Sequence, residues 1–169
     1  MPALDAAAIH GRAKARFGDA ISALAGTRRD NMCATVAPAK IVDVCRFLQT
    51  EPGLEFDCLS NLSGVDYPKR GVIEMVYHLY SYKHRHLFTL KVEAARDSPV
   101  VPTIAGVWSH ADWQEREVFD LLGVVFDGHP DLRRILMPED WPGHPLRKDF
   151  VEPEEYHGIS TSRESLLKA

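Results

Sequence analysis

The 169-residue sequence lacks the cysteine patterns that usually hold metals and clusters. It contains three cysteines, Cys33, Cys45 and Cys58, and no C-x-x-C pair. Because zinc and iron–sulfur centres are mostly held by cysteines at such short spacings, we do not expect this chain to hold one. Three widely spaced cysteines also argue against a disulfide framework. The sequence therefore predicts three reduced thiols in or near a core.

Glycine loops for nucleotides are missing as well. The 11 glycines are scattered along the chain, and the pattern Gly-x-Gly does not occur. Neither a dinucleotide-binding fingerprint nor a phosphate-binding loop is present. The nucleophile motif G-x-S-x-G is also absent. Nucleotide binding and nucleophilic catalysis by this chain therefore find no support.

Long apolar runs and a strong excess of one charge are absent too. No stretch approaches the ~20 apolar residues that cross a bilayer, and residues 1–5 do not begin a secretory signal. The net charge of −4 gives no indication of a nucleic-acid-binding face. Hydrophobic residues make up 45% of the chain, enough for a core. We expect a soluble cytosolic protein that meets a membrane only through partners and binds no nucleic acid.

The hydrophobic pattern predicts an α+β domain, an antiparallel sheet packed with helices. Three segments have the apolar spacing of helices: residues 3–17, 39–49 and 110–122. Four segments have the composition or alternation of strands: residues 32–37, 54–66, 72–80 and 86–93. Short turns separate the last three strands, which predicts an antiparallel meander.

The helix over 110–122 is the most informative element. Ser109 is a good N-cap with Asp112 as the capping acid, and Gly123 is the expected stop. Its apolar side is formed by Ala111, Val118, Phe119, Leu121 and Leu122. The opposite side carries three charged residues that we expect to form exposed ion pairs: Asp112, Arg116 and Asp120.

Glu115 breaks this pattern because it falls inside the apolar arc. A carboxylate there must find a partner or shift its pKa. The favoured interpretation is a buried ion pair with Arg133 or Arg134 that fixes the tail or a neighbouring subunit. A catalytic or proton-relay acid, or a helix that is simply exposed at this point, are the alternatives.

The character of the chain changes near residue 126. Residues 127–160 contain prolines 130, 138, 142, 145 and 153, and large apolar side chains are spread among them. We therefore divide the chain into an α+β domain over 1–125 and a long extended C-terminal tail over 126–169. The tail is expected to lie on a partner's surface, with folding back onto its own domain as the alternative. We expect fast hydrogen exchange beyond about residue 126 in the isolated chain.

Histidines offer a weaker hypothesis. His84 and His86 form an H-x-H pair at a strand edge, where alternate residues share a face. Together with a carboxylate they would suit a metal-dependent hydrolase, although the sequence indicates no third ligand. His129, His144 and His157 are dispersed along the tail. Solvated or structural histidines are the favoured interpretation.

One long stretch resembles a known family. Residues 115–136 read EREVFDLLGVVFDGHPDLRRIL, and residues 138–150 read PEDWPGHPLRKDF. Both are similar to the signature and tail of the 30 kDa subunit family of respiratory complex I, whose bacterial members are called the C subunit of NADH-quinone oxidoreductase. LSGVDY at 62–67 and VYHL at 76–79 are similar to its central strands. The positions that we take as interface and signature residues are Glu115, Arg116, Glu117, Asp120, Gly123, His129, Arg133, Arg134, Trp141, His144 and Arg147.

This resemblance implies a non-catalytic structural subunit of a proton-translocating NADH:quinone oxidoreductase. It implies no cofactor bound by this chain, since FMN and the iron–sulfur clusters lie in partner subunits. The expected partners are the large subunit that forms the quinone cavity and the cluster-bearing subunits of the peripheral arm. The expected location is the cytoplasmic side of the bacterial cell membrane. The alternative is an equivalent subunit of an energy-converting hydrogenase, a formate hydrogenlyase-type complex or a photosynthetic NAD(P)H-type complex.

Overall fold

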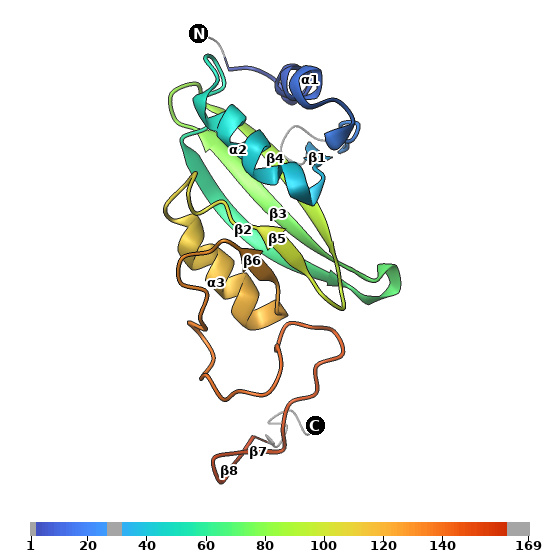
Figure 1. Cartoon of the computed structure of the whole chain (residues 1–169), viewed down its shortest axis with the longest axis vertical. Coiled ribbons are helices and arrows are strands. Elements are labelled where there is room, and N and C mark those ends of the chain that lie inside the picture. The colour runs from blue at the N-terminus through green and yellow to red at the C-terminus, as the bar shows by residue number, and fades with distance from the viewer. Residues whose placement is uncertain (1–2, 27–31, 162–169) are drawn as a thin grey trace, which may run out of the picture.

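A computed structural model of the chain describes residues 3–26 and 32–161 (Figure 1). It contains the helices α1 (Ala6–Phe17), α2 (Ile41–Thr50) and α3 (Ala111–Leu122). The strands are β1 (Cys33–Thr35), β2 (Cys58–Tyr67), β3 (Val72–Ser81), β4 (His86–Ala95), β5 (Val100–Pro102), β6 (Val125–Asp127), β7 (Glu155–Tyr156) and β8 (Ile159–Ser160). The predicted α+β class is confirmed.

Four strands form the main sheet in the order β1-β4-β3-β2. The neighbours β2, β3 and β4 are antiparallel, as the predicted meander requires, and β1 joins the edge parallel to β4. β2 begins at Cys58 rather than at residue 54. The reason is local, because Leu54 and Phe56 are buried in the turn after α2 and Glu55 has a positive φ of 39° that no strand can contain.

One face of this sheet carries the core. Along β3, Ile73, Met75 and Tyr77 are buried, whereas Val76 and His78, which point to the other face, are more exposed. Figure 1 shows α2 and α3 in front of the same sheet face. The strict alternation of strand side chains is what places both helices on one side.

Contact between α3 and the sheet depends on Gly64 of β2. A Cβ atom at this position would collide with Leu122 and crowd Val118, both on the apolar side of α3. The backbone of β2 therefore approaches α3 more closely than any larger residue would allow. This close packing fixes the helix that carries four of the eleven signature residues, Glu115, Arg116, Glu117 and Asp120.

The two ends of α3 differ from each other in how well they match the sequence pattern. Gly123 ends the helix with φ of 75°, and its N–H donates to the Phe119 carbonyl at 2.8 Å, as predicted. The predicted capping box is wrong, because His110 is the N-cap and no side chain caps it. Instead, the Trp108 carbonyl accepts from the Ala111 N–H at 2.9 Å, so a preceding backbone turn supplies the acceptor.

After β6 the chain is extended, with no helix or strand until β7. β6 pairs with β5 as a separate small sheet, so the boundary proposed at residue 125 falls inside a strand. In Figure 1 the tail lies below α3 and extends away from α1 and α2. Within 3–26 and 32–161, no helix has the length and hydrophobicity required to span a bilayer.

Candidate functional site

Five signature residues, Asp120, Gly123, Arg134, His144 and Arg147, come together where the tail crosses the end of α3. Asp120 lies on this helix, and its side chain is completely buried. Its Oδ2 atom accepts the backbone N–H groups of Ile135, Leu136 and Met137 at 3.0, 2.7 and 2.9 Å. One carboxylate oxygen thus holds three consecutive residues of the tail, because successive backbone N–H groups in a turn can point at a single anionic oxygen.

The second oxygen of Asp120 pairs with Arg134. The Nη1–Oδ1 distance is 3.0 Å, and the Nη2 atom of Arg134 also donates to the carbonyls of Trp141 and Gly143 at 3.2 and 3.0 Å. Burial alone would raise the pKa of Asp120, but the three donated N–H bonds and Arg134 outweigh it, and the pKa is lowered. The ionised carboxylate is therefore the form that holds the tail.

The tail also caps the C-terminus of α3, where the last carbonyls of a helix lack partners. His144 Nδ1 donates to the Asp120 carbonyl at 2.9 Å, the Leu146 N–H donates to the Leu121 carbonyl at 2.9 Å, and Arg147 Nε donates to the Leu122 carbonyl at 2.7 Å. The three contacts occur in the same order along the tail and along the end of α3. They bind the tail to the helix without any regular secondary structure.

Gly123 makes this crossing possible in two ways. Its positive φ ends the helix, and the His144 ring fills the space that a Cβ atom of residue 123 would need. A Cβ atom at residue 123 would lie 2.5 Å from His144 Nε2. The glycine is thus required both for the helix cap and for the close approach of the tail.

A second anchor ties the tail to the main sheet. Asp66 of β2 is buried and accepts Arg96 Nε at 2.7 Å and the Lys148 N–H at 2.8 Å. Arg96 Nη2 reaches on to Asp149 at 2.5 Å. The hydrogen bonds from Arg96 lower the pKa of Asp66. The tail is therefore held at two points, one on α3 and one on β2.

Glu115 is buried as the helical pattern predicted, but its partners are different from those expected. Its Oε1 atom accepts the Ile104 N–H at 2.7 Å, and Oε2 accepts the Thr103 hydroxyl. The predicted ion pair with Arg133 or Arg134 is wrong, because neither residue reaches it. These two neutral donors join α3 to the loop after β5.

Burial raises the pKa of Glu115 to about 7, against the opposing effect of the two hydrogen bonds. The buried His129 ring lies beside it, with Nε2 3.7 Å from Glu115 Oε2. His129 Nδ1 accepts the Asp131 N–H, and Nε2 donates to the Asp112 carbonyl. This hydrogen-bond pattern assigns a neutral ring, so His129 supplies no counter-ion to Glu115.

Of the ion pairs expected on α3, the one between Asp112 and Arg116 is present at 3.8 Å, whereas Asp120 pairs with Arg134 instead, and the expected exposure is wrong. Asp120 and Arg116 are buried, and only Asp112 is partly exposed. They are covered because the tail returns over this side of the helix, where Arg116 Nε donates to the Arg133 carbonyl at 3.3 Å. The Arg116 guanidinium also lies 4.8 Å from the Trp113 ring.

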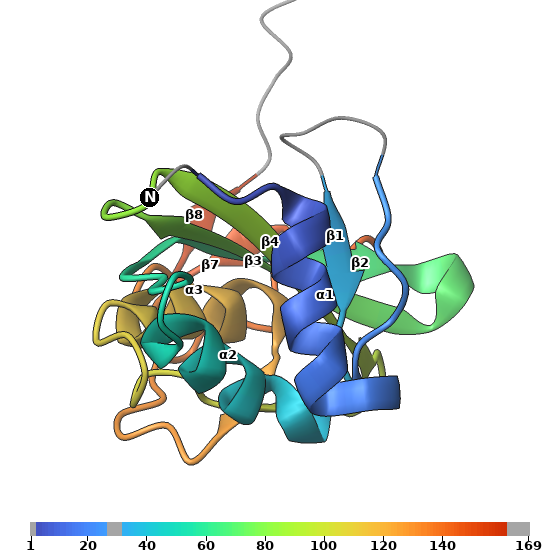
Figure 2. The same ribbon diagram turned by 90° about the horizontal axis from the view of Figure 1, so that it is seen from above.

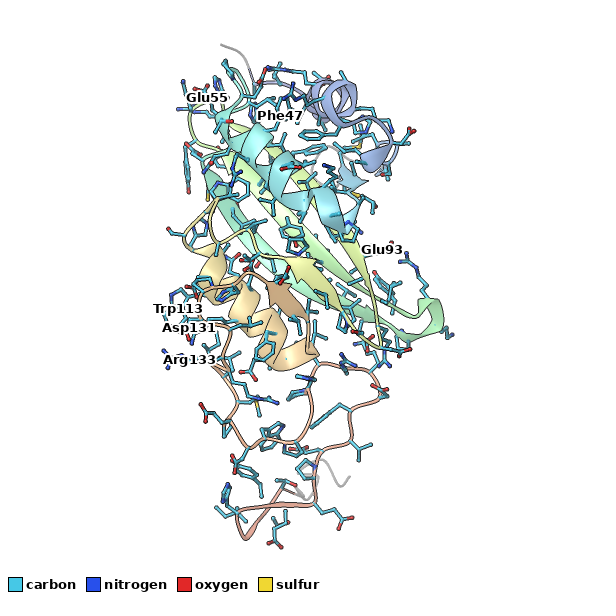
Figure 3. The ribbon with its side chains drawn as sticks, in the orientation of Figure 1. Phe47, Glu55, Glu93, Trp113, Asp131 and Arg133 are labelled. Carbon is cyan, nitrogen blue, oxygen red and sulfur yellow. The ribbon has the colours of Figure 1, made fainter. Side chains whose placement is uncertain are left out.

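Two signature residues point outward. Glu117 is exposed on α3, and Arg133 is exposed and pairs with Asp131 at 3.0 Å. In Figure 3, Trp113 lies on the outer side of α3, and Asp131 and Arg133 lie at the beginning of the tail. Trp141 lies farther along the tail, against Tyr156 at a ring distance of 4.9 Å.

Several apolar side chains of α3 and the tail are exposed. The exposed fractions are 62% for Trp113, 59% for Leu136, 54% for Leu146 and 84% for Val151. We call this set the tail surface. Large apolar groups at such exposure are typical of residues that anchor protein interfaces.

The H-x-H pair lies at the β3–β4 hairpin. His84 contacts Glu55, with 2.5 Å between Nε2 and Oε2, and stacks on His86 at 5.5 Å. His86 Nε2 donates to the Leu54 carbonyl at 2.7 Å. Hydrogen bonds from Lys83 and then His84 lower the pKa of Glu55 to about 2. Among the residues outside 1–2, 27–31 and 162–169, no three potential metal ligands come together.

The remaining predicted residues have structural contacts. His157 pairs with Asp140 at 2.7 Å near the end of the described tail. Cys45 is fully buried, and burial raises the pKa of its thiol, which disfavours a reactive thiolate. Asp66, Arg96, Thr103 and Asp149 were not identified as site residues from the sequence. Asp66 lies within the LSGVDY motif, which is the only signal that pointed near it.

The chain matches known proteins over most of its length. The family model for the respiratory-chain NADH dehydrogenase 30 Kd subunit matches residues 34–156. The NADH-quinone oxidoreductase C subunit of Roseiflexus sp. (strain RS-1) is 50% identical over 148 residues, which cover 87% of this chain and 84% of the relative. The protein of the same name from Chlorobium phaeobacteroides is 43% identical over 145 residues, 85% of this chain and 87% of the relative.

Two solved structures share the fold. One belongs to the membrane-bound sulfane sulfur reductase, an archaeal respiratory membrane complex, with a TM-score of 0.72, 26% identity and coverage of 86% of this chain and 85% of that chain. The other is a trypsin-resistant fragment of Nqo5, with a TM-score of 0.61, 25% identity and coverage of 75% and 98%. Because the family model and these relatives extend over most of both chains, this chain belongs to the 30 Kd subunit family of respiratory-chain NADH dehydrogenase.

Proposed function

We propose that this chain is a non-catalytic structural subunit of the peripheral arm of a proton-translocating NADH:quinone oxidoreductase. In this role it supports electron transfer from NADH to quinone, and partner subunits hold the FMN and the iron–sulfur clusters. Its partners are the large subunit of the quinone cavity and the cluster-bearing subunits. The proposed location is the cytoplasmic side of the bacterial cell membrane, reached through the complex.

The single observation that carries this proposal is the fixed, extended tail with its apolar side chains outward. Asp120 and Arg134 hold residues 134–143 by hydrogen bonds rather than by a hydrophobic core. Leu136 and Leu146 are therefore left exposed on a backbone that is held in place. Such a segment has a small ordering cost when a partner covers it, because its conformation exists beforehand.

A supporting subunit of this kind has a clear physical task. Electron transfer requires cofactors at fixed separations, and a rigid neighbour that docks on the cluster-bearing subunits restricts their movement. The Trp113–Arg116 pair and the tail surface offer the aromatic and apolar groups that interfaces bury at their centre.

The test is a double substitution, Leu136→Asp with Leu146→Asp, in a strain that lacks the native gene. Because both side chains are exposed, the isolated subunit should keep its melting temperature within a few degrees, while the complex should lose most of this subunit and of its NADH:quinone activity. The matched control is Tyr82→Asp with Leu87→Asp, two exposed positions at the β3–β4 hairpin. Normal assembly of the tail variant would contradict the proposal.

A second candidate is an equivalent subunit of another membrane-bound redox complex of the same kind, such as an energy-converting hydrogenase, a formate hydrogenlyase-type complex or a photosynthetic NAD(P)H-type complex. It is favoured by the similarity to the sulfane sulfur reductase chain, which extends over 86% of this chain. Identification of the chains that co-purify with this subunit separates the two, since only the first includes a flavin-bearing NADH-oxidising subunit.

A further inference from the structure

A groove lies between α1 and α2, far from the tail surface. Figure 2 shows the two helices side by side in front of the sheet, and Figure 1 shows them at the end of the molecule opposite the tail. Phe17 and Phe47 meet edge to face at 5.6 Å across the helices. The groove has a volume of about 830 Å³.

The charges of this groove are unbalanced. Both acidic side chains are already paired, Glu51 with Arg12 at 2.6 Å and Asp43 with Lys40 at 3.3 Å. Arg16 and Arg46 also line the groove and are exposed. Within 3–26 and 32–161, neither of these two guanidinium groups has an ion pair or a hydrogen bond. In the described part of the chain, two guanidinium groups therefore face one groove without counter-ions.

The groove also has an apolar surface, formed by Phe17 and Phe47. Phe17 and Phe47 are only partly buried, and both pack against the hydrophobic core. A ligand would therefore meet an aromatic surface bordered by two cations. Guanidinium groups bind carboxylates in a two-pronged geometry, and exposed aromatic rings favour an apolar side chain next to them. Carboxylates and an apolar side chain on one short strand or helical turn satisfy both requirements.

We infer that the α1–α2 groove docks an acidic segment of a partner subunit, with two carboxylates on Arg16 and Arg46 and an apolar side chain on Phe17 and Phe47. This inference rests on the proposed function, because the partner belongs to the same complex. α1 precedes the residues that the family model matches, which begin at 34. The groove is a second contact, separate from the one made by the tail.

The experiment uses the assembled complex. A photo-crosslinking amino acid replaces Ala15, an exposed residue of α1 that lines the groove. After irradiation, the crosslinked peptide is identified by mass spectrometry. The expected product is a partner segment with at least two acidic residues close to the crosslink.

Charge reversal then tests the recognition. Arg16→Glu with Arg46→Glu should lower the crosslink yield about tenfold, since two attractions become repulsions. The matched control, Lys69→Glu with Arg85→Glu, changes the same total charge at exposed positions and should leave the yield within about twofold. Neither pair contributes to the core, so the melting temperatures should agree.

The inference is overturned if, in the assembled complex, the crosslinking residue at position 15 reacts with a neutral or basic segment, with a second copy of this chain, with lipid, or with nothing. Equal losses of yield in both charge-reversed pairs also overturn it. Failure of the chain to co-purify with any other subunit would overturn the proposed function together with this inference. The first group of results leaves the proposed function standing.

Discussion

Arg134 and the fully buried Asp120 form an ion pair at 3.0 Å that joins the last turn of α3 to the tail. Both groups have further partners, because Asp120 accepts three backbone N–H groups and Arg134 donates to two carbonyls. The pair sets the path of the tail from residue 134 to residue 143. A buried pair of this type fixes one geometry more than it adds stability.

Asp120→Ala should therefore destabilise the isolated chain by about 3 kcal/mol, because Arg134 and three N–H groups lose their shared acceptor. The measurement is urea unfolding at neutral pH. The control is Glu117→Ala, an exposed position on the same helix, for which we expect a change of less than about 0.5 kcal/mol. Equal effects of the two substitutions would contradict the anchoring role of Asp120.

Acid should release the same anchor. The pKa of Asp120 is lowered in the folded chain, so its ionised form adds stability at pH values above its ordinary value of 3.8. That contribution is lost as the pH falls below 3.8 toward the folded pKa. The Asp120→Ala chain should show a weaker loss of stability over this range. Parallel curves for the two proteins would refute the linkage.

Glu115 should have the opposite pH dependence. Its pKa is raised from 4.5 to about 7, so the folded chain holds the proton more tightly than the unfolded chain. Stability from this group is complete below pH 4.5 and falls as the pH rises to about 7, by about 3 kcal/mol in total. Glu115→Gln cannot ionise and should remove this slope. A wild-type slope that persists in the variant would show that another group causes it.

Gly123→Ala tests the contact between the helix cap and the tail. Both Gly123 and Gly71 have positive φ, but a Cβ atom would collide with a side chain, that of His144, only at Gly123. Gly71→Ala should cost about 1 kcal/mol for the backbone alone. Gly123→Ala should cost more and should also speed hydrogen exchange at Leu146. Equal costs with unchanged exchange would mean that His144 moves aside freely.

Hydrogen exchange in the isolated chain gives a direct view of the tail. The sequence pattern predicts fast exchange beyond about residue 126, but the N–H groups of residues 135–137 are held by the buried Asp120. With these contacts we predict slow exchange at the three residues and at Lys148, and fast exchange at the exposed Val151. Uniformly fast exchange would favour the expectation from the sequence pattern instead.

The α+β fold was predictable because its signal is local. Alternation along β3 and β4 and the helical spacing of α3 come from neighbouring residues, and Gly123 ends the helix by its own backbone freedom. The burial of Glu115 followed from the same spacing. Strand β2 was extended too far because the pattern of Leu54 and Phe56 matches both a strand and a buried turn.

The partners of the buried charges were not predictable in the same way. Asp120 appeared exposed on the isolated helix, and only the return of the tail 15 residues later covers it. Asp66 binds the Lys148 N–H across 82 residues, which no local pattern encodes. For the tail, the two interpretations were docking on a partner and folding back onto its own domain. Residues 134–149 bind their own domain, whereas the side chains of Leu136 and Leu146 point outward.

The most direct test of the proposed function is affinity purification of this chain from its native membranes at moderate salt, with identification of the co-purifying chains and an assay of NADH:quinone activity. We predict recovery with a flavin-bearing NADH-oxidising subunit, cluster-bearing subunits and membrane subunits, and with activity. Recovery of the chain alone, as a stable monomer, would contradict it.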